Sequence, residues 1–130
     1  MEAIKPQDLR IGSQLMNNNR GICTVTAVFL MAEQYCVTVS QNKTIVNIPI
    51  ALEAFEPIKL TEEILRTVKF KNVEGDLWEL NRFHLVAVQD NFRFYWHKVS
   101  GKLGMSATQI NTWHDLQNLY YSLTGVQLEL

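Results

Sequence analysis

The stretch on which the predicted fold depends lies near the end of the chain and reads Asn111-Thr112-Trp113-His114-Asp115-Leu116-Gln117-Asn118-Leu119-Tyr120-Tyr121-Ser122-Leu123-Thr124-Gly125. Its large apolar side chains recur at steps of three and four residues and fill an arc of about 120° on a helical wheel. They are Trp113, Leu116, Leu119, Tyr120 and Leu123. Thr112 is a favoured N-cap, Asp115 suits the positive end of the helix dipole, and Gly125 favours the conformation that ends helices. These signals predict a helix between Thr112 and Gly125, around which the preceding strands fold.

A stripe of polar residues runs beside the apolar one on this helix. Its members stand at positions i, i+3, i+4 and i+7; they are His114, Gln117, Asn118 and Tyr121. One interpretation is a polar surface that binds a partner or ligand. The favoured interpretation is that these groups satisfy the backbone of neighbouring loops, because most side-chain hydrogen bonds go to backbone or water.

The composition is that of an ordinary globular protein. The 130 residues are 47% hydrophobic and 19% charged, with a formal net charge of −1. This is too apolar for intrinsic disorder, and the near-zero charge argues against a dedicated binder of duplex nucleic acid. We expect a single compact domain over residues 1–130, with an N-terminal β subregion of about residues 1–56 and an α+β subregion of about residues 57–130.

The cysteines and the N-terminal segment bear on the compartment. Cys23 and Cys36 lie in strand-like surroundings, where small buried thiols in a reducing compartment are favoured over a disulfide or a reactive thiol. Residues 1–6 contain no apolar signal core. The longest nearly apolar run, residues 22–32, is shorter than the ~20 residues that span a bilayer. We therefore expect a cytoplasmic protein, or one delivered by a route that the sequence does not show, with no membrane partner.

The first half of the chain predicts an antiparallel meander. Its strand-like segments are rich in β-branched and apolar residues and are separated by turn signals. They cover residues 11–16, 21–31, 35–40 and 43–48. Short meanders of this kind are typical of a small curled sheet or an SH3-like partial barrel.

The second half predicts a helix followed by another antiparallel sheet. Thr61 is the expected cap of a middle helix whose buried side includes Leu65. Strand-like segments then cover residues 77–90, 92–99 and 102–106. Because strands and helices do not alternate regularly, the fold class is α+β. We expect the C-terminal helix to pack on this second sheet, against Phe94 and Trp96.

One predicted strand interleaves aromatic and cationic residues, Phe92-Arg93-Phe94-Tyr95-Trp96-His97-Lys98. Alternation places Phe94 and Trp96 on one face, which suits packing under a helix. Arg93, Tyr95 and His97 then share the other face, where aromatic rings and cations would form a stacking platform for single-stranded nucleic acid. The packing role is favoured, because one strand lacks the full motif of a known nucleic-acid module.

The same hairpin motivates a metal-site hypothesis. With a two-residue turn at Asp90-Asn91, His84 faces His97 across the ladder, and paired imidazoles are candidate ligands or a proton switch. No further ligand pattern accompanies them, so two partly exposed strand histidines are the favoured interpretation. No nucleophile elbow, phosphate loop or metalloprotease helix is present either. The sequence therefore predicts no catalytic residue, no metal and no cofactor.

The terminal motif resembles the closing signature of a known family. His114-Asp115-Leu116-Gln117-Asn118-Leu119-Tyr120-Tyr121-Ser122-Leu123-Thr124-Gly125 is similar to the signature of small uncharacterised proteins from Bacteroides-type bacteria, their phages and mobile elements. Two further stretches resemble the family in the same order, Leu9-Arg10-Ile11-Gly12 and Pro57-Ile58-Lys59-Leu60-Thr61-Glu62-Glu63. Asp115 stands where the family usually has Gln, Lys59 where it has Pro, and position 121 is often Phe. The resemblance implies a phage or mobile-element context and brings no activity, cofactor or site residue.

These observations favour a non-enzymatic accessory module that binds another protein or itself. The candidate binding surface combines the polar stripe with the outer face of the aromatic strand, namely Arg93, Tyr95, His97, His114, Gln117, Asn118 and Tyr121. The first alternative is a nucleic-acid-associated protein that uses residues 92–98. The second is an enzyme of unrecognised type, for which the three histidines are the only candidates.

Overall fold

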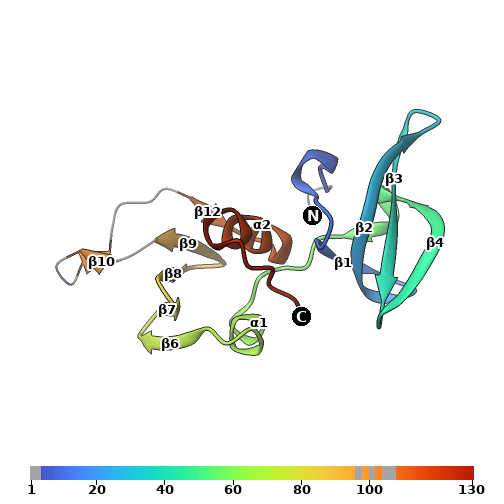
Figure 1. Ribbon diagram of the computed structural model, residues 1–130. Coiled ribbons are helices and arrows are strands. Elements are labelled where there is room, and N and C mark those ends of the chain that lie inside the picture. Colours follow the sequence, from blue (N-terminus) through green and yellow to red (C-terminus); the bar gives the residue numbers. More distant parts are fainter. Residues whose placement is uncertain (1–3, 96–97, 100–101, 104–107) are drawn as a thin grey trace. The chain divides into compact units, whose positions relative to one another are not determined.

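The computed structural model describes residues 4–95, 98–99, 102–103 and 108–130, and the chain divides into two units (Figure 1). The first unit comprises Met1–Ile58 with Trp113–Glu129, and the second comprises Lys59–Thr112 with Leu130. Among the described residues, each unit holds one five-stranded antiparallel sheet and one α-helix. The α+β class with two antiparallel sheets is therefore confirmed.

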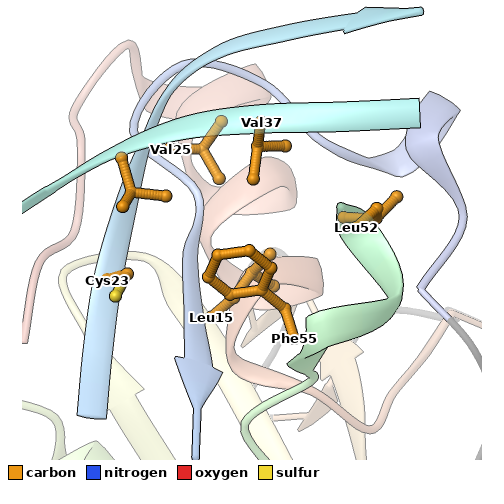
Figure 2. Close-up of a cluster of buried hydrophobic side chains, with 7 residues drawn as sticks. Leu15, Cys23, Val25, Val37, Leu52 and Phe55 are labelled. Carbon is orange, nitrogen blue, oxygen red and sulfur yellow. The ribbon is translucent and has the colours of Figure 1, made fainter. Parts of the chain in front are cut away.

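The first unit is a meander that buries one face of its sheet. Its elements are the 3₁₀ turn η1 (Pro6–Asp8), β1 (Gln14–Asn17), β2 (Gly21–Met31), β3 (Gln34–Gln41), β4 (Thr44–Ala51), the 3₁₀ turn η2 (Leu52–Ala54), β5 (Phe55–Glu56) and α2 (Trp113–Thr124). The sheet order is β4-β3-β2-β1-β5. Alternate residues of the strands supply the core, in which the labelled side chains of Figure 2 point toward one another. The core residues are Leu15, Cys23, Val25, Val37, Val39, Leu52 and Phe55.

The sheet of the first unit is open. β4 and β5 are its opposite edges, and within the described part of the chain no ladder joins them. β5 is only two residues long and pairs with β1 alone, while β4 carries Pro49 and an irregular register opposite Val37 and Val39. A proline and a bulge both interrupt the row of backbone donors that a closing strand would need. The SH3-like partial barrel expected from the sequence is therefore not confirmed.

Helix α2 begins and ends where the sequence predicts. It starts directly after Thr112, and the N–H of Gly125, at φ +73°, donates to Tyr121 O at 2.8 Å as the helix stops. Its central apolar side chains are buried as expected; they are Trp113, Leu116 and Tyr120. The local signals were therefore sufficient to define this element.

One prediction about α2 is wrong, because Leu123 was expected in the core but is 43% exposed. The packing of the helix against Phe94 and Trp96 stays a prediction: α2 is grouped with the first unit and Phe94 with the second, and Trp96 lies outside the described residues. Within the first unit, α2 makes a buried polar contact with β1, in which the indole N–H of Trp113 donates to Gln14 Oε1 at 2.9 Å.

The second unit is a meander of short strands that follows a short capped helix. Its elements are α1 (Glu62–Thr67), β6 (Lys71–Glu74), β7 (Leu77–Leu80), β8 (Phe83–Val88), β9 (Asn91–Tyr95), β10 (Lys98–Val99), β11 (Lys102–Leu103) and β12 (Gln109–Ile110). The five-stranded sheet has the order β12-β9-β8-β7-β6, and β10 pairs with β11. The Thr61 hydroxyl accepts from Ile64 N at 3.3 Å, which confirms the predicted cap. The ring of Phe83 lies 4.4 Å from Phe94 and 6.0 Å from Phe70, within the buried face.

The β8–β9 hairpin turns one residue earlier than predicted. Val88 pairs with Asn91, so Gln89 and Asp90 form the turn, with Gln89 at φ +57°. The ladder shifts by two residues as a result, and His84 faces Tyr95 rather than His97. Because a shift of two preserves the side-chain alternation, each residue keeps its predicted face.

Candidate functional site

The polar stripe of α2 is largely structural, and we define the clasp as the hydrogen bonds that join Gln117 to Gly12, Gln14 and Leu128. Gln117 is fully buried; its Oε1 accepts from Gln14 N at 2.8 Å, and its Nε2 donates to Gly12 O at 3.0 Å and Leu128 O at 2.9 Å. One side chain therefore joins the entry to β1, the helix and the C-terminal tail. At Gly12 the φ is +101°, a backbone conformation that favours glycine, and a Cβ there would approach the Gln127 carboxamide to 3.1 Å, so Gln127 would have to shift.

Arg10 and Asn118 extend this clasp. The Arg10 guanidinium lies 4.3 Å from the centroid of the Tyr121 ring, donates to Gln117 O at 2.9 Å and bonds Gln127 Oε1. Asn118 Nδ2 donates to Asp8 O. Of the four stripe residues, only Tyr121 is exposed, at 46%. Gln117 and Asn118 thus bond backbone groups, which is the structural role favoured over a binding surface.

Two stretches that lie far apart in the sequence, residues 9–12 and 114–125, meet in this clasp. Arg10 and Gly12 come from the first stretch and Gln117 from the terminal one, and they are joined by the two hydrogen bonds given above. The two motifs are separated by about a hundred residues of chain, as the sequence separations of 107 and 105 residues show. The two stretches therefore stabilise the first unit together, through hydrogen bonds that join one stretch to the other.

His114 is buried in the first turn of α2. Its Nε2 lies 3.8 Å from Asp115 Oδ1, and its Nδ1 is buried with no hydrogen-bond partner among the described residues. Burial lowers the pKa of His114 from its ordinary value of 6.5, although the carboxylates of Asp115 and Asp8 act to raise it. The imidazole is therefore neutral at pH 7, and it belongs to the interior rather than to a binding surface.

His84 lies in the second unit, on β8. It is 5% exposed; its Nε2 is 3.5 Å from Glu79 Oε2 across the β7–β8 ladder, and Tyr95 is its partner on β9. His97, the expected partner, lies outside the described residues. In the described part of the chain, no group of three His, Cys, Asp or Glu residues could hold a metal ion.

Strand β9 presents its two faces as predicted. Phe92 and Phe94 are buried at 5% and 8% exposure, whereas Arg93 is exposed and Tyr95 is half-buried on the opposite face. Arg93 faces Val86 on β8 and Gln109 on β12. The strand therefore offers one cation and one partly accessible ring to a ligand.

A further surface was not anticipated from the sequence. The long strands β2 and β3 form a hairpin (Figure 1). The hairpin ends in a turn at Ala32 and Glu33, whose φ angles are both positive (48° and 64°). At its end Leu30 pairs with Tyr35, and Leu30, Met31 and Tyr35 are 58%, 49% and 46% exposed. The signal in the sequence is that apolar residues continue on both faces up to the turn, where alternation would place polar ones.

The end of this hairpin is acidic as well as apolar. Glu33 lies in the turn, and Gln34 Nε2 donates to Glu53 Oε1 at 3.2 Å, which fixes a second exposed carboxylate beside it. Residues 21–58 contain only two further charges, Lys43 and Glu56. Lys43 follows the opposite end of β3, so it does not neutralise this end. We define the hairpin-tip surface as Leu30, Met31, Glu33, Tyr35 and Glu53.

The two cysteines contribute no site. Cys23 and Cys36 are both buried and free, as the sequence analysis expected. Burial raises the pKa of the Cys23 thiol, and the nearby Arg20 only partly opposes this effect. A buried thiol with a raised pKa is unreactive at neutral pH.

Comparisons with known proteins add no assignment to these features. No family model matches the chain, and neither a curated protein nor a solved structure matches it. Over the residues that the structure describes, no helix has the length and apolar character needed to cross a membrane.

Proposed function

We propose that the protein is a non-enzymatic accessory module that binds another protein through its hairpin-tip surface. The observation that carries the proposal is the presence of three exposed apolar side chains at the end of one hairpin, with Leu30 and Tyr35 on one face and Met31 on the other. Single exposed apolar residues are common on any protein surface, whereas several of them gathered beside polar groups mark an interaction site.

The magnitude of this contact indicates a transient complex. Fully burying a side chain such as leucine or methionine contributes about 1.5–3 kcal/mol, and roughly half of that remains available at Leu30 and at Met31. With a similar contribution from Tyr35, the tip supplies about 2–4 kcal/mol. This free energy suits a small, transient interface and is too low for a permanent one.

The framework of the first unit supports this use. The strand order β4-β3-β2-β1-β5, with the 3₁₀ turn η2 between β4 and β5, supports an SH3-like arrangement of the strands. Small sheets of this kind present their hairpins and loops on a rigid base, and function resides in those exposed segments. The resemblance of the terminal motif supports a phage or mobile-element context for the module.

The test is a selection of binders from a random peptide library on the intact chain. We expect the recovered peptides to bind the parent protein at least about tenfold more tightly than a Leu30→Ser, Met31→Ser, Tyr35→Ser variant, since about 1.4 kcal/mol corresponds to a factor of ten. The matched control is Ile45→Ser with Ile48→Ser, which removes side chains of the same unit that are 63% and 70% exposed. Peptides that bind the parent and the tip variant equally would refute the proposal.

A second candidate function is binding of single-stranded nucleic acid by the outer face of β9. It is favoured by the exposed Arg93 and the partly accessible Tyr95 ring on one face. Fluorescence anisotropy with labelled single-stranded DNA and RNA at low and moderate salt tests it. Binding that is absent at low salt, or unchanged in the Arg93→Ala, Tyr95→Ala variant, would eliminate this function.

A further inference from the structure

We infer that the partner of the hairpin-tip surface is a protein segment that carries aliphatic or aromatic side chains flanked by Lys or Arg. This inference rests on the proposed function, because it names the chemistry of the partner that the tip would bind. It depends on two features of the tip, its exposed apolar centre and its acidic rim.

The apolar centre requires apolar side chains from the partner. Leu30 and Tyr35 form a cross-strand pair on the face that carries the core residues Val25 and Val37 further along the hairpin. Met31 pairs with Gln34 and points to the other face. A partner that binds the tip therefore contacts apolar side chains on both faces of the hairpin. A single peptide segment can do this by wrapping around the turn.

The acidic rim selects positive charge. Glu33 and Glu53 are both exposed beside this centre, and Glu53 is held there by Gln34. Within residues 21–58 the only cation is Lys43, beyond the far end of β3. Uncompensated carboxylates at the edge of an apolar patch favour Lys or Arg on the partner and repel like charge.

The same charges disfavour the other occupants. Phosphate groups of nucleic acid or of an anionic membrane would face Glu33 and Glu53 at close range. A second copy of the chain, bound tip to tip, would place four carboxylates around one apolar contact.

The experiment examines the peptides recovered by selection on the intact chain. We expect them to combine apolar residues with Lys or Arg. A resynthesised peptide should bind a Glu33→Lys, Glu53→Lys variant about tenfold more weakly than the parent at low salt, and the difference should shrink at high salt. The matched control is Glu56→Lys, another exposed glutamate of this unit, which lies on β5 opposite Met16 and should leave binding unchanged.

Each other result overturns the inference in a distinct way. Tip-dependent peptides without basic residues would leave the proposed function standing and remove the charge requirement. Failure to recover any tip-dependent peptide would remove both. Dimerisation of the parent chain in light scattering, abolished in the Leu30→Ser, Met31→Ser, Tyr35→Ser variant, would assign the tip to a second copy. Binding of anionic lipid vesicles that this variant loses would assign it to a membrane.

Discussion

Replacing Gln117 by leucine removes the clasp of the first unit while nearly preserving side-chain volume. The change leaves Gln14 N–H, which pairs with Gln117 Oε1, as a buried donor without that partner. An unsatisfied buried donor costs about 1–3 kcal/mol. The carbonyls of Gly12 and Leu128 each lose one donor but keep Gln127 Nε2, at 3.2 Å and 3.1 Å, so each loss costs only about 0.5–1 kcal/mol.

The expected total is therefore about 2–5 kcal/mol, a large part of the ~5–15 kcal/mol that stabilises a typical domain. Urea unfolding followed by tryptophan fluorescence measures it, since Trp113 lies within the clasp. The midpoint should fall while the slope stays constant. Gln109→Leu is the matched control, because Gln109 is exposed and the same substitution there should change stability by less than about 0.5 kcal/mol. A Gln117→Leu midpoint equal to that of the parent would refute the role of the clasp.

Three further predictions follow from burial, pKa and turn geometry. Leu116→Ala, at a fully buried site, should cost about 2–5 kcal/mol, whereas Leu123→Ala should cost under about 1 kcal/mol; equal urea midpoints would contradict this. Burial lowers the pKa of His114 in the folded protein, so the unfolded chain binds more protons below about pH 6.5; stability should fall as pH decreases from about 7 to about 5, and His114→Gln should weaken that slope. Replacing Ala32-Glu33 by Asn-Gly should raise the unfolding free energy by about 0.5–1 kcal/mol, because both positions have positive φ, yet weaken binding of basic peptides; a variant that binds them as the parent does would contradict the charge requirement.

The sequence defined α2 because its signals are local. The cap position, the apolar period and the stop at Gly125 all lie within fifteen residues, and the helix has the predicted ends. Where it packs depends on Gln117 and Trp113 reaching residues about a hundred positions earlier in the chain. An apolar stripe alone does not identify these polar partners, so periodicity could not predict them.

The register of the β8–β9 hairpin and the hairpin tip show a second limit. Within Gln89-Asp90-Asn91, the two-residue turn can be either Gln89-Asp90 or Asp90-Asn91. The structure uses the first pair, with Gln89 at positive φ, although Asp and Asn tolerate this conformation better than most residues. The exposure of Leu30 could not be predicted from the sequence for a different reason. A strand residue is assigned to the core from its apolar character, but β2 and β3 extend beyond the residues that cover that core.

The hairpin-tip surface is the proposed site at which the protein binds its partner. Amide chemical-shift mapping of the isotope-labelled chain, titrated with a peptide recovered by selection, locates the bound peptide on the protein. We expect shifts concentrated in residues 29–36 and 52–54, and their loss in the Glu33→Lys, Glu53→Lys variant but not in Glu56→Lys. Shifts concentrated instead on β9 around Arg93, or along α2 around Tyr121, would contradict it.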